Sequence, residues 1–205
     1  MKPVFRQTQL YTFLLYTNGK GLEKKILDLG AGGNLPPLAI FNDQGYETYG
    51  IDISDEQIQR AKEFEKKQGI SLNIMKGDMT QLPFDNDAMP YIYSYNSIFH
   101  MSKKEIGEAI KEIHRVLSVG GLAFLNFPTI NDAHATHGEK VGEGEYLQEE
   151  YGEKVLHSYF DIEEPEKLYF EGFEVIYKEN RIRNGFMRDG TRVTRGFVDY
   201  ILEKK

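Results

Sequence analysis

The stretch that decides the fold is ILDLGAGGNLPPLAIF, residues 26–41. Its apolar start predicts a strand over Lys25–Leu29, which leads into three glycines within residues 30–33. Two prolines and a second apolar run follow, and proline is tolerated in the first turn of a helix because the amides there have no intrahelical partners. A strand, a glycine loop and a helix in this order allow backbone to approach a ligand closely and to point N–H groups at it.

The loop nearly matches the dinucleotide pattern GxGxxG, with one difference. The sixth position, counted from Gly30, is Leu35. In a dinucleotide site the third glycine permits tight packing of the helix against the strand beside the pyrophosphate. Leu35 therefore disfavours a dinucleotide and favours a nucleoside ligand without phosphates, and a purely structural turn is the alternative.

The rest of the chain alternates between strand-like and helix-like segments, which is typical of a parallel sheet with helices on its faces. Capping-box spacings at Ser54 and Ser102 predict helices that run to about Gln68 and Leu117. A turn with Asn-Gly and Asp-Gly pairs joins the last two strands, so we expect an antiparallel hairpin there. The later strands are predicted at Glu47–Ile53, Leu72–Met75, Tyr91–Tyr95, Leu122–Phe127, Phe173–Ile182 and Val193–Leu202, and a short helix at Glu164–Phe170.

Composition narrows the class of protein. The chain has 205 residues, 40% of them hydrophobic, which suits one globular domain. It lacks cysteine, any apolar run long enough to span a bilayer and a recognisable signal peptide, so a cytoplasmic protein with no membrane partner is expected. The net charge of −7 argues against a nucleic-acid partner. We interpret the segment that carries the arginines near the end of the chain as a solvated hairpin.

Two carboxylates follow predicted strands. Asp52 ends the second strand, where a carboxylate can accept hydrogen bonds from both ribose hydroxyls. Asp78 follows the third strand, in the crevice where open α/β sheets bind ligands, and could accept the amino group of an adenine while Met79 lies against the base. The alternatives are structural: Asp52 as a helix cap and Asp78 as a turn residue.

Taken together, five motifs resemble those of class I S-adenosylmethionine-dependent methyltransferases that act on small molecules. They are ILDLGAGGN, YGIDIS, GDMTQLPF, YIYSYNSIFHM and IHRVLSVGGLAFL, in this order and spacing, and they cover about Lys24 to Phe127. The resemblance implies an α/β, Rossmann-like fold: a mostly parallel seven-stranded sheet with helices on both faces and a C-terminal antiparallel hairpin. It also implies transfer of a methyl group from S-adenosylmethionine to a small-molecule acceptor.

Carried over by position, the resemblance implies a set of cofactor-binding residues. They are Gly30, Ala31, Gly32, Asn34, Leu35, Asp52, Ile53, Asp78, Met79, Tyr95 and Asn96. Two positions depart from the family: Met89-Pro90 stands where Phe-Asp is common, which puts the start of the fourth strand in doubt, and Val119 replaces a proline before paired glycines. Neither position is an expected cofactor contact.

Catalysis needs few groups, because the sulfonium is already activated and the protein mainly supplies proximity and alignment. We therefore name no certain catalytic residue. His100 is the candidate base, needed only if the acceptor loses a proton, and packing is its alternative role. Tyr11, His100 and Tyr159 are candidate substrate contacts. His134 and His137 form an H-x-x-H pair without an obvious third ligand, so no metal is expected.

The chain is expected to form a single domain, 1–205, with four parts. These are an N-terminal cap helix (1–23), a cofactor-binding core (24–127), a lid or insertion (128–160), and a C-terminal helix and hairpin (161–205). Glutamates in the third part favour a neutral or cationic acceptor: Glu139, Glu143, Glu145, Glu149 and Glu150. A protein or RNA methyltransferase, a non-catalytic nucleoside-binding protein and an NAD-binding protein are the alternatives.

Overall fold

A computed structural model describes residues 3–150, 152–186 and 190–205, with the side chain of residue 150 excepted. The helices are α1 (Thr8–Lys20), α2 (Leu38–Asp43), α3 (Asp55–Gln68), α4 (Lys103–Val116) and α5 (Glu164–Tyr169), with a 3₁₀ turn η1 (Ile98–His100). The strands are β1 (Lys25–Leu29), β2 (Glu47–Asp52), β3 (Ile74–Lys76), β4 (Met89–Ser94), β5 (Leu117–Pro128), β6 (Glu139–Gly142), β7 (Glu145–Glu150), β8 (Glu153–Ser158), β9 (Phe173–Phe186) and β10 (Arg192–Lys204).

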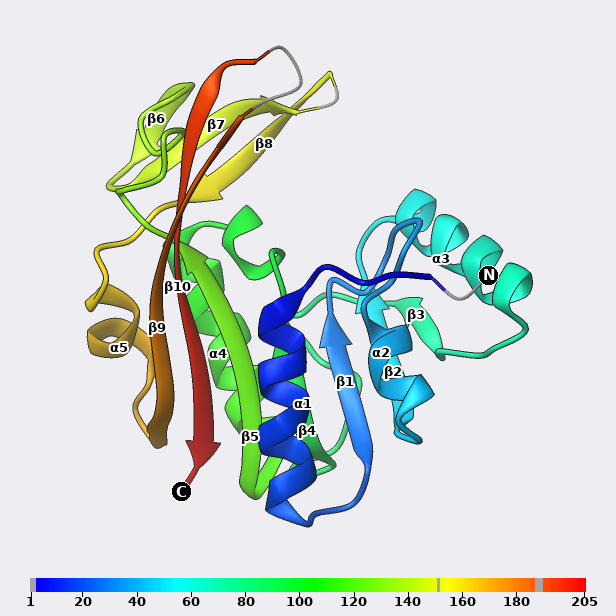
Figure 1. The fold of residues 1–205 in the computed structure, drawn as a ribbon. Helices are drawn as coiled ribbons and strands as arrows, with labels where there is room; N and C mark the ends of the chain where they lie inside the picture. Colours follow the sequence, from blue (N-terminus) through cyan, green and yellow to red (C-terminus); the bar gives the residue numbers. More distant parts are fainter. Residues whose placement is uncertain (1–2, 151, 187–189) are drawn as a thin grey trace.

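The main sheet has seven strands in the order β3-β2-β1-β4-β5-β10-β9 (Figure 1). Strands β1 to β5 are parallel, and β10 pairs antiparallel with both β5 and β9. Apolar side chains of α1, α2 and α3 pack on one face, and those of α4 pack on the other. The predicted α/β, Rossmann-like sheet with a C-terminal antiparallel hairpin is confirmed.

Local sequence explains where the helices begin and end. The Ser54 side chain accepts a hydrogen bond from the Gln57 amide, and Gly69 ends α3 in the left-handed conformation. At α4, Ser102 and Glu105 form a complete capping box. Ile106, Ile110 and Ile113 follow at helical spacing and are buried, which places the apolar stripe of α4 against the sheet.

Several strand boundaries differ from the sequence prediction. Strand β3 begins at Ile74, because Asn73 has a left-handed backbone (φ +53°) that interrupts an extended chain. Strand β4 begins at Met89, and its pairing with β5 shifts register between Met89 and Tyr91, which accommodates Pro90. Strand β5 starts directly after α4 and continues to Pro128. Residue 189, in the predicted Asp-Gly turn pair, lies outside the described residues.

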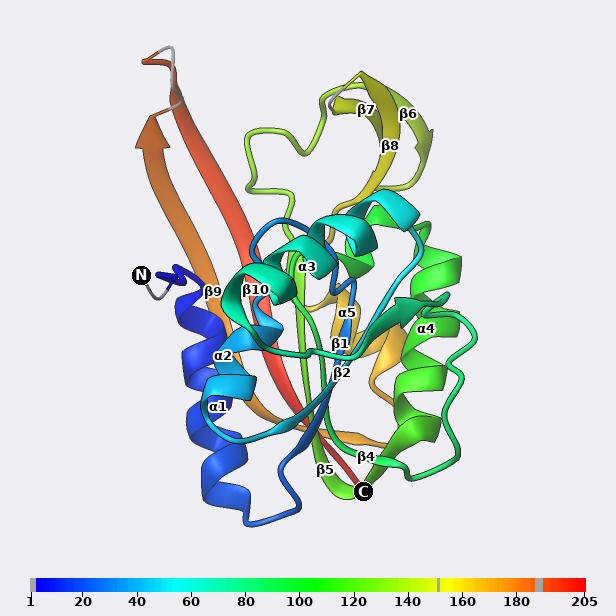
Figure 2. The ribbon, with the colours of Figure 1, turned by 90° about the vertical axis from the view of Figure 1, so that its right-hand side faces the viewer.

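Residues 128–160, expected to be a lid or an irregular insertion, contain a second sheet. It is antiparallel with the order β6-β7-β8. Together with the upper half of the β9–β10 hairpin, this sheet rises above the carboxyl ends of the parallel strands (Figures 1 and 2). Throughout the described parts of the chain, every helix is too short or too polar to cross a membrane.

Candidate functional site

The glycine loop lies where β1 ends, beside the carboxyl end of β2. The amides of Gly30 and Ala31 both donate to the Ile51 carbonyl at 2.9 Å. The Gly32 amide donates to Oδ2 of Asp52 at 2.9 Å, and the Gly33 amide donates to the Gln57 carbonyl at 2.9 Å. Backbone hydrogen bonds therefore fix the loop against β2 and the first turn of α3.

Two positions of the loop require glycine because neighbouring side chains approach their Cα atoms closely. A Cβ added to Gly30, whose φ is +94°, would lie 1.9 Å from Oγ of Ser97. A Cβ added to Gly32 would lie 2.4 Å from Cβ of Gln57 and 2.6 Å from Oδ2 of Asp52. Any side chain at either position would push away the residues that close the loop.

The same hydrogen bonds correct one expectation. The sequence suggested that the loop points N–H groups at a ligand, but the amides of residues 30–33 all donate within the protein. A pyrophosphate needs such donors, so the loop offers no phosphate cradle. Leu35 is 38% exposed and stands outside the packed core. These features favour a nucleoside without phosphates over a dinucleotide.

Asp52 links the loop to α3. Its Oδ1 accepts the Ser54 amide at 2.9 Å, and its Oδ2 accepts the Gly32 amide. A carboxylate has about four acceptor positions, so both oxygens retain capacity for hydroxyl donors. The next residue, Ile53, is 70% exposed and offers an apolar surface beside the carboxylate.

Asp78 and Met79 follow β3, the neighbour of β2. Asp78 is exposed, and its Oδ1 accepts both the amide and the hydroxyl of Thr80, at 2.8 and 2.7 Å. This is the turn role that the sequence left open, and the second carboxylate oxygen faces no hydrogen-bond donor within residues 3–150, 152–186 and 190–205. Met79 is partly buried against the core.

Tyr95 and Asn96 follow β4. Tyr95 is half-buried, its ring stacks on Phe124 at a centroid distance of 6.3 Å, and burial raises the pKa of its hydroxyl. That hydroxyl also hydrogen-bonds with the side-chain amide of Gln9 at 3.4 Å, which brings α1 to the site. Asn96 is exposed and has a left-handed backbone.

The three candidate substrate residues lie in two different parts of the structure. The His100 ring lies 4.5 Å from the His157 ring, and the Tyr159 ring stacks on His157 at 6.3 Å, so β8 brings His100 and Tyr159 into one cluster. Tyr159 is buried, and its hydroxyl accepts a hydrogen bond from Gln148 at 3.0 Å. Tyr11 instead lines a pocket of about 240 Å³ with residues along α2 and at the end of α3, and none of the glycine-loop residues lines it.

The upper half of the β9–β10 hairpin carries arginines, which the sequence interpreted as a solvated hairpin. Arg181 makes a bidentate ion pair with Asp199, at 2.8 and 3.0 Å, and the Asp199 side chain is fully buried. Arg195 pairs with the buried Asp132 at 2.8 Å. Both guanidinium groups lie over the Phe197 ring. In this part of the hairpin, Arg181 and Arg195 are therefore held by ion pairs and by the Phe197 ring and are not simply solvated.

Sequence reasoning missed several polar groups in the core near the loop. Asp28 lies inside β1, and the Tyr93 hydroxyl donates to its Oδ2 at 2.7 Å. Burial raises the pKa of Asp28 to about 8. Asn126 is fully buried in β5. Both interrupt apolar runs, ILDL and FLNF, and that interruption was the available signal.

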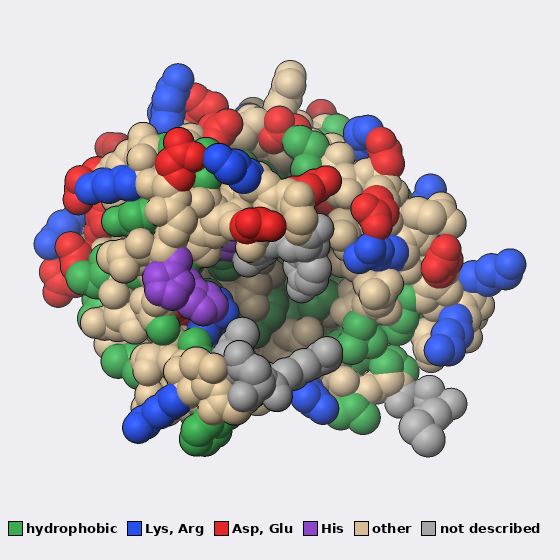
Figure 3. All heavy atoms as spheres, turned by 90° about the horizontal axis from the view of Figure 1, so that it is seen from above, with side chains coloured by type: hydrophobic (Ala, Val, Ile, Leu, Met, Phe, Trp, Pro, Cys, Tyr) green, Lys and Arg blue, Asp and Glu red, His purple; other side chains and the backbone are tan. Residues whose placement is uncertain are grey.

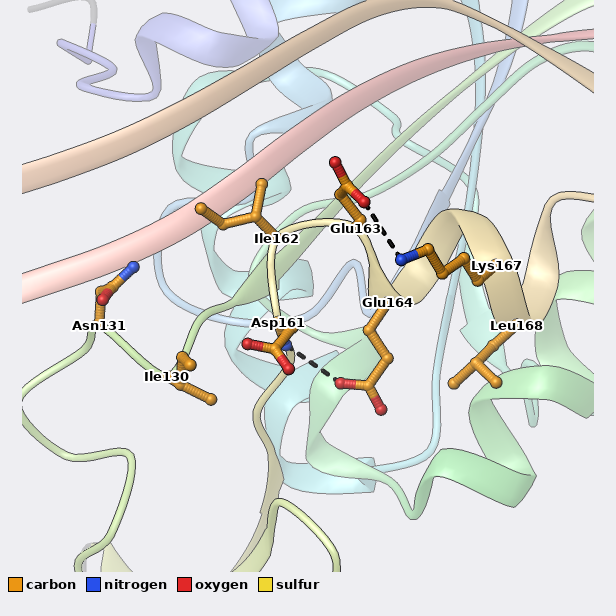
Figure 4. A pocket seen from close by; sticks show the side chains of 8 residues that line it. All are labelled: Ile130, Asn131, Asp161, Ile162, Glu163, Glu164, Lys167 and Leu168. Atoms are coloured by element: carbon orange, nitrogen blue, oxygen red, sulfur yellow. Dashed lines mark hydrogen bonds and ion pairs between the residues drawn. The ribbon is translucent and has the colours of Figure 1, made fainter.

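Seen from above, the molecule is hollowed over the carboxyl ends of the parallel strands, with histidine side chains at the rim (Figure 3). A separate pocket of about 660 Å³ lies between the segment after β5 and α5 (Figure 4). It contains none of the loop residues. Among the residues that the structure describes, no three His, Cys, Asp or Glu side chains cluster closely enough to hold a metal ion.

Comparisons with known proteins agree with this geometry. A family described as "Methyltransferase domain" matches residues 27–125. The chain is 32% identical to a sterol 24-C-methyltransferase of Pneumocystis carinii over 154 residues, which is 65% of this chain and 40% of that protein. It is 30% identical to 24-methylenesterol C-methyltransferase 2 of Arabidopsis thaliana, over 77% of this chain and 43% of that protein. The chain thus spans about two fifths of the length of these curated relatives.

Solved structures show the same fold. A protein of Pyrococcus horikoshii OT3 has a TM-score of 0.74 at 20% identity, covering 98% of this chain and 90% of that one. A SAM-dependent methyltransferase of Methanosarcina mazei has a TM-score of 0.72 at 24% identity, covering 93% of this chain and 96% of that one.

Proposed function

Because the chain belongs to the class I S-adenosylmethionine-dependent methyltransferase family, we propose that it transfers a methyl group from S-adenosylmethionine to a small-molecule acceptor. The observation that carries the proposal is the glycine loop tied to Asp52, inside the matched residues. Gly30 and Gly32 have no space for a side chain, and the amides of residues 30–33 all donate within the protein. A carboxylate, Asp52, and the exposed Ile53 lie beside the loop.

The residues at this edge fit a sulfonium nucleoside. Asp52 retains acceptor capacity for ribose hydroxyls, and Ile53 offers an apolar face for a base. Asp78 has a carboxylate oxygen for an exocyclic amino group. The proposed donor-binding set, called the donor edge below, is Gly30, Ala31, Gly32, Asn34, Leu35, Asp52, Ile53, Asp78, Met79, Tyr95 and Asn96.

When bound, S-adenosylmethionine supplies a methyl group that is already activated for displacement. The chain then has to hold the acceptor in line and exclude water. His100 lies beside the donor edge in η1 and is the proposed proton acceptor for an acceptor that must lose a proton. In this proposal residues 1–23 cap the hollow and residues 128–160 form a lid above it.

The acceptor is proposed to be small. Two relatives are named as sterol methyltransferases, which supports a small-molecule class, but their greater length leaves the acceptor itself open. The lid glutamates give little reason to favour a cationic acceptor. Glu139 pairs with Lys154 and Glu143 with Lys140, while Glu145 accepts the Lys103 amide. Three of the five glutamates thus already have partners within the protein.

The direct test is a transfer assay. The purified chain is incubated with S-adenosylmethionine carrying a deuterated methyl group and with pooled small-molecule acceptors, and products are identified by mass. We expect a labelled product that requires the chain and is greatly reduced for Asp52→Ala. If S-adenosylhomocysteine binds but no pool is labelled, the chain is a nucleoside-binding protein instead.

The lid proposal has its own test, limited proteolysis within residues 128–160. We expect cleavage to slow when S-adenosylhomocysteine and an acceptor bind together. Equal cleavage with and without both ligands would place the acceptor elsewhere.

A further inference from the structure

The turn that follows β4 is held by one buried side chain from β5. The Asn96 amide donates to Oδ1 of Asn126 at 2.8 Å, and Nδ2 of Asn126 donates to Oδ1 of Asn96 at 2.6 Å. Asn126 is fully buried between Leu125 and Phe127, whereas Asn96 is exposed. A polar group in such a core costs free energy unless it is hydrogen-bonded, and these bonds use both ends of the Asn126 amide on one residue.

The hydrogen bonds between Asn96 and Asn126 hold the backbone of Asn96 in an unusual conformation. Its φ is +54°, in the left-handed region that costs an ordinary residue about 1–2 kcal/mol. Asparagine tolerates this region better than most residues, but it also samples ordinary conformations in a free turn. The two bonds from Asn126 select the left-handed one.

The selected turn closes the glycine loop. Ser97 follows Asn96, and its Oγ occupies the space that a Cβ on Gly30 would need. On the other side, the Ser94 hydroxyl donates to the Leu29 carbonyl at 3.0 Å and accepts the Ile98 amide at 3.1 Å. The turn is therefore fixed to β1 by Ser94 and to β5 by Asn126, with Gly30 beneath it.

We propose that Asn126 is a positioning residue for the methyl donor: it holds the turn of residues 95–97 in the conformation that completes the donor edge. The inference rests on the proposed function, since it assumes that the loop binds S-adenosylmethionine. Asn126 acts through Asn96 and Ser97 and touches no reactant. Without the Asn126 side chain, the turn adopts the left-handed conformation only part of the time. The apparent affinity for the methyl donor then falls in proportion to that fraction.

The test is calorimetric titration of S-adenosylhomocysteine into four variants. Asn126→Ala should bind about tenfold more weakly, because the left-handed conformation is no longer imposed. Asn96→Gly alone shows what the Asn96 side chain contributes directly, and it is the reference for the double variant. In this glycine background Asn126→Ala should change affinity by less than about threefold, because glycine adopts positive φ readily and no longer needs Asn126 to hold the turn. A tenfold loss in the glycine background as well, or native affinity in Asn126→Ala, would overturn the inference.

Asn73→Ala is the matched control. Asn73 also has a left-handed backbone, φ +53°, and its Nδ2 donates to the Thr48 carbonyl at 3.0 Å, but it lies at the opposite end of the sheet, before β3. It should lose stability without losing affinity. If Asn126→Ala does not fold, Asn126→Leu replaces it, with the same tenfold loss expected, because leucine fills a similar volume but cannot hydrogen-bond to Asn96. Absence of binding by the native chain would instead refute the proposed function.

Discussion

The donor edge and the wall above it face the same hollow but are held in different ways. At the donor edge, backbone amides bond to neighbouring strands and glycines touch their neighbours closely. The upper wall comprises β6–β8 and the upper half of the β9–β10 hairpin. Its strands pair with one another, the buried Asp132 links the segment after β5 to the hairpin, and the ion pairs on β6–β8 are exposed. The difference suggests a fixed donor site beneath a wall that adjusts more easily.

The largest expected effect comes from Gly30→Ala. The new Cβ meets Ser97 and the backbone keeps a φ of +94°, so we expect unfolding free energy to fall by about 3–5 kcal/mol. Gly45→Ala is the control, because Gly45 also has a positive φ, +78°, but no atom lies within 4 Å of its added Cβ. Urea unfolding measures both. Equal losses in the two variants would show that the loop is not closely packed.

A pH-dependent effect should come from Asp28→Asn. Burial raises the pKa of Asp28 to about 8, so the folded protein holds a proton that the unfolded chain releases. Wild-type stability therefore declines as pH rises from about 4 through 8. Asparagine removes this decline and can still accept the Tyr93 hydroxyl, so the variant should be more stable by on the order of 2–4 kcal/mol at pH 9 and by little at pH 4.

Thermal unfolding across pH measures this difference. Asp85→Asn, which also removes one carboxylate but an exposed one, serves as the control and should not reproduce the gain in stability at pH 9. A pH-independent difference between Asp28→Asn and the native chain would mean that Asp28 is ionised in the fold.

A smaller effect is expected from Asp132→Ala in the upper wall. The Asp132 carboxylate accepts Arg195 at 2.8 Å, the Gly196 amide at 3.1 Å and the His134 amide at 2.9 Å. Leaving these donors unpaired should cost about 1–3 kcal/mol. Hydrogen exchange should quicken in residues 139–158 and 192–197 while residues 26–33 remain protected. Faster exchange in both regions would mean that the two are one cooperative unit.

The smallest effect is expected from Lys154→Ala. Its ion pair with Glu139 is exposed, with 69% and 62% of the two side chains accessible. Such pairs contribute about 0–1 kcal/mol, so the melting temperature and the rate of proteolysis within residues 128–160 should hardly change. A large loss would show that the upper wall depends on surface charge more than its contacts indicate.

Much of the fold followed from local signals. Capping residues placed α3 and α4, and hydrophobic runs placed the strands of the sheet. What the sequence could not supply were effects of long-range contacts. Asn73, whose side chain bonds to Thr48 of β2, has a left-handed backbone that delays the start of β3. Residues 139–158 form a sheet although their composition is polar. The periodicity of apolar residues indicates which face of an element is buried against a core. The β6–β8 sheet buries too few apolar side chains to produce a clear pattern.

The candidate site was anticipated unevenly for the same reason. The loop and Asp52 stand in contiguous motifs, so spacing alone brought them together. His157 and Asn126 reach the site from β8 and β5, and only the tertiary fold places them beside His100 and Asn96. Tyr11, the third candidate substrate contact, lies in a separate pocket against α2 and the end of α3.

The central claim is that the donor edge binds a sulfonium nucleoside and not a dinucleotide. Isothermal titration of S-adenosylhomocysteine and of NAD into the native chain and Asp52→Ala tests it most directly. We expect S-adenosylhomocysteine alone to bind, with affinity weakened about tenfold to a hundredfold in Asp52→Ala by loss of charge-assisted hydrogen bonds. No binding of S-adenosylhomocysteine, equal binding of NAD, or unchanged affinity in Asp52→Ala would contradict it.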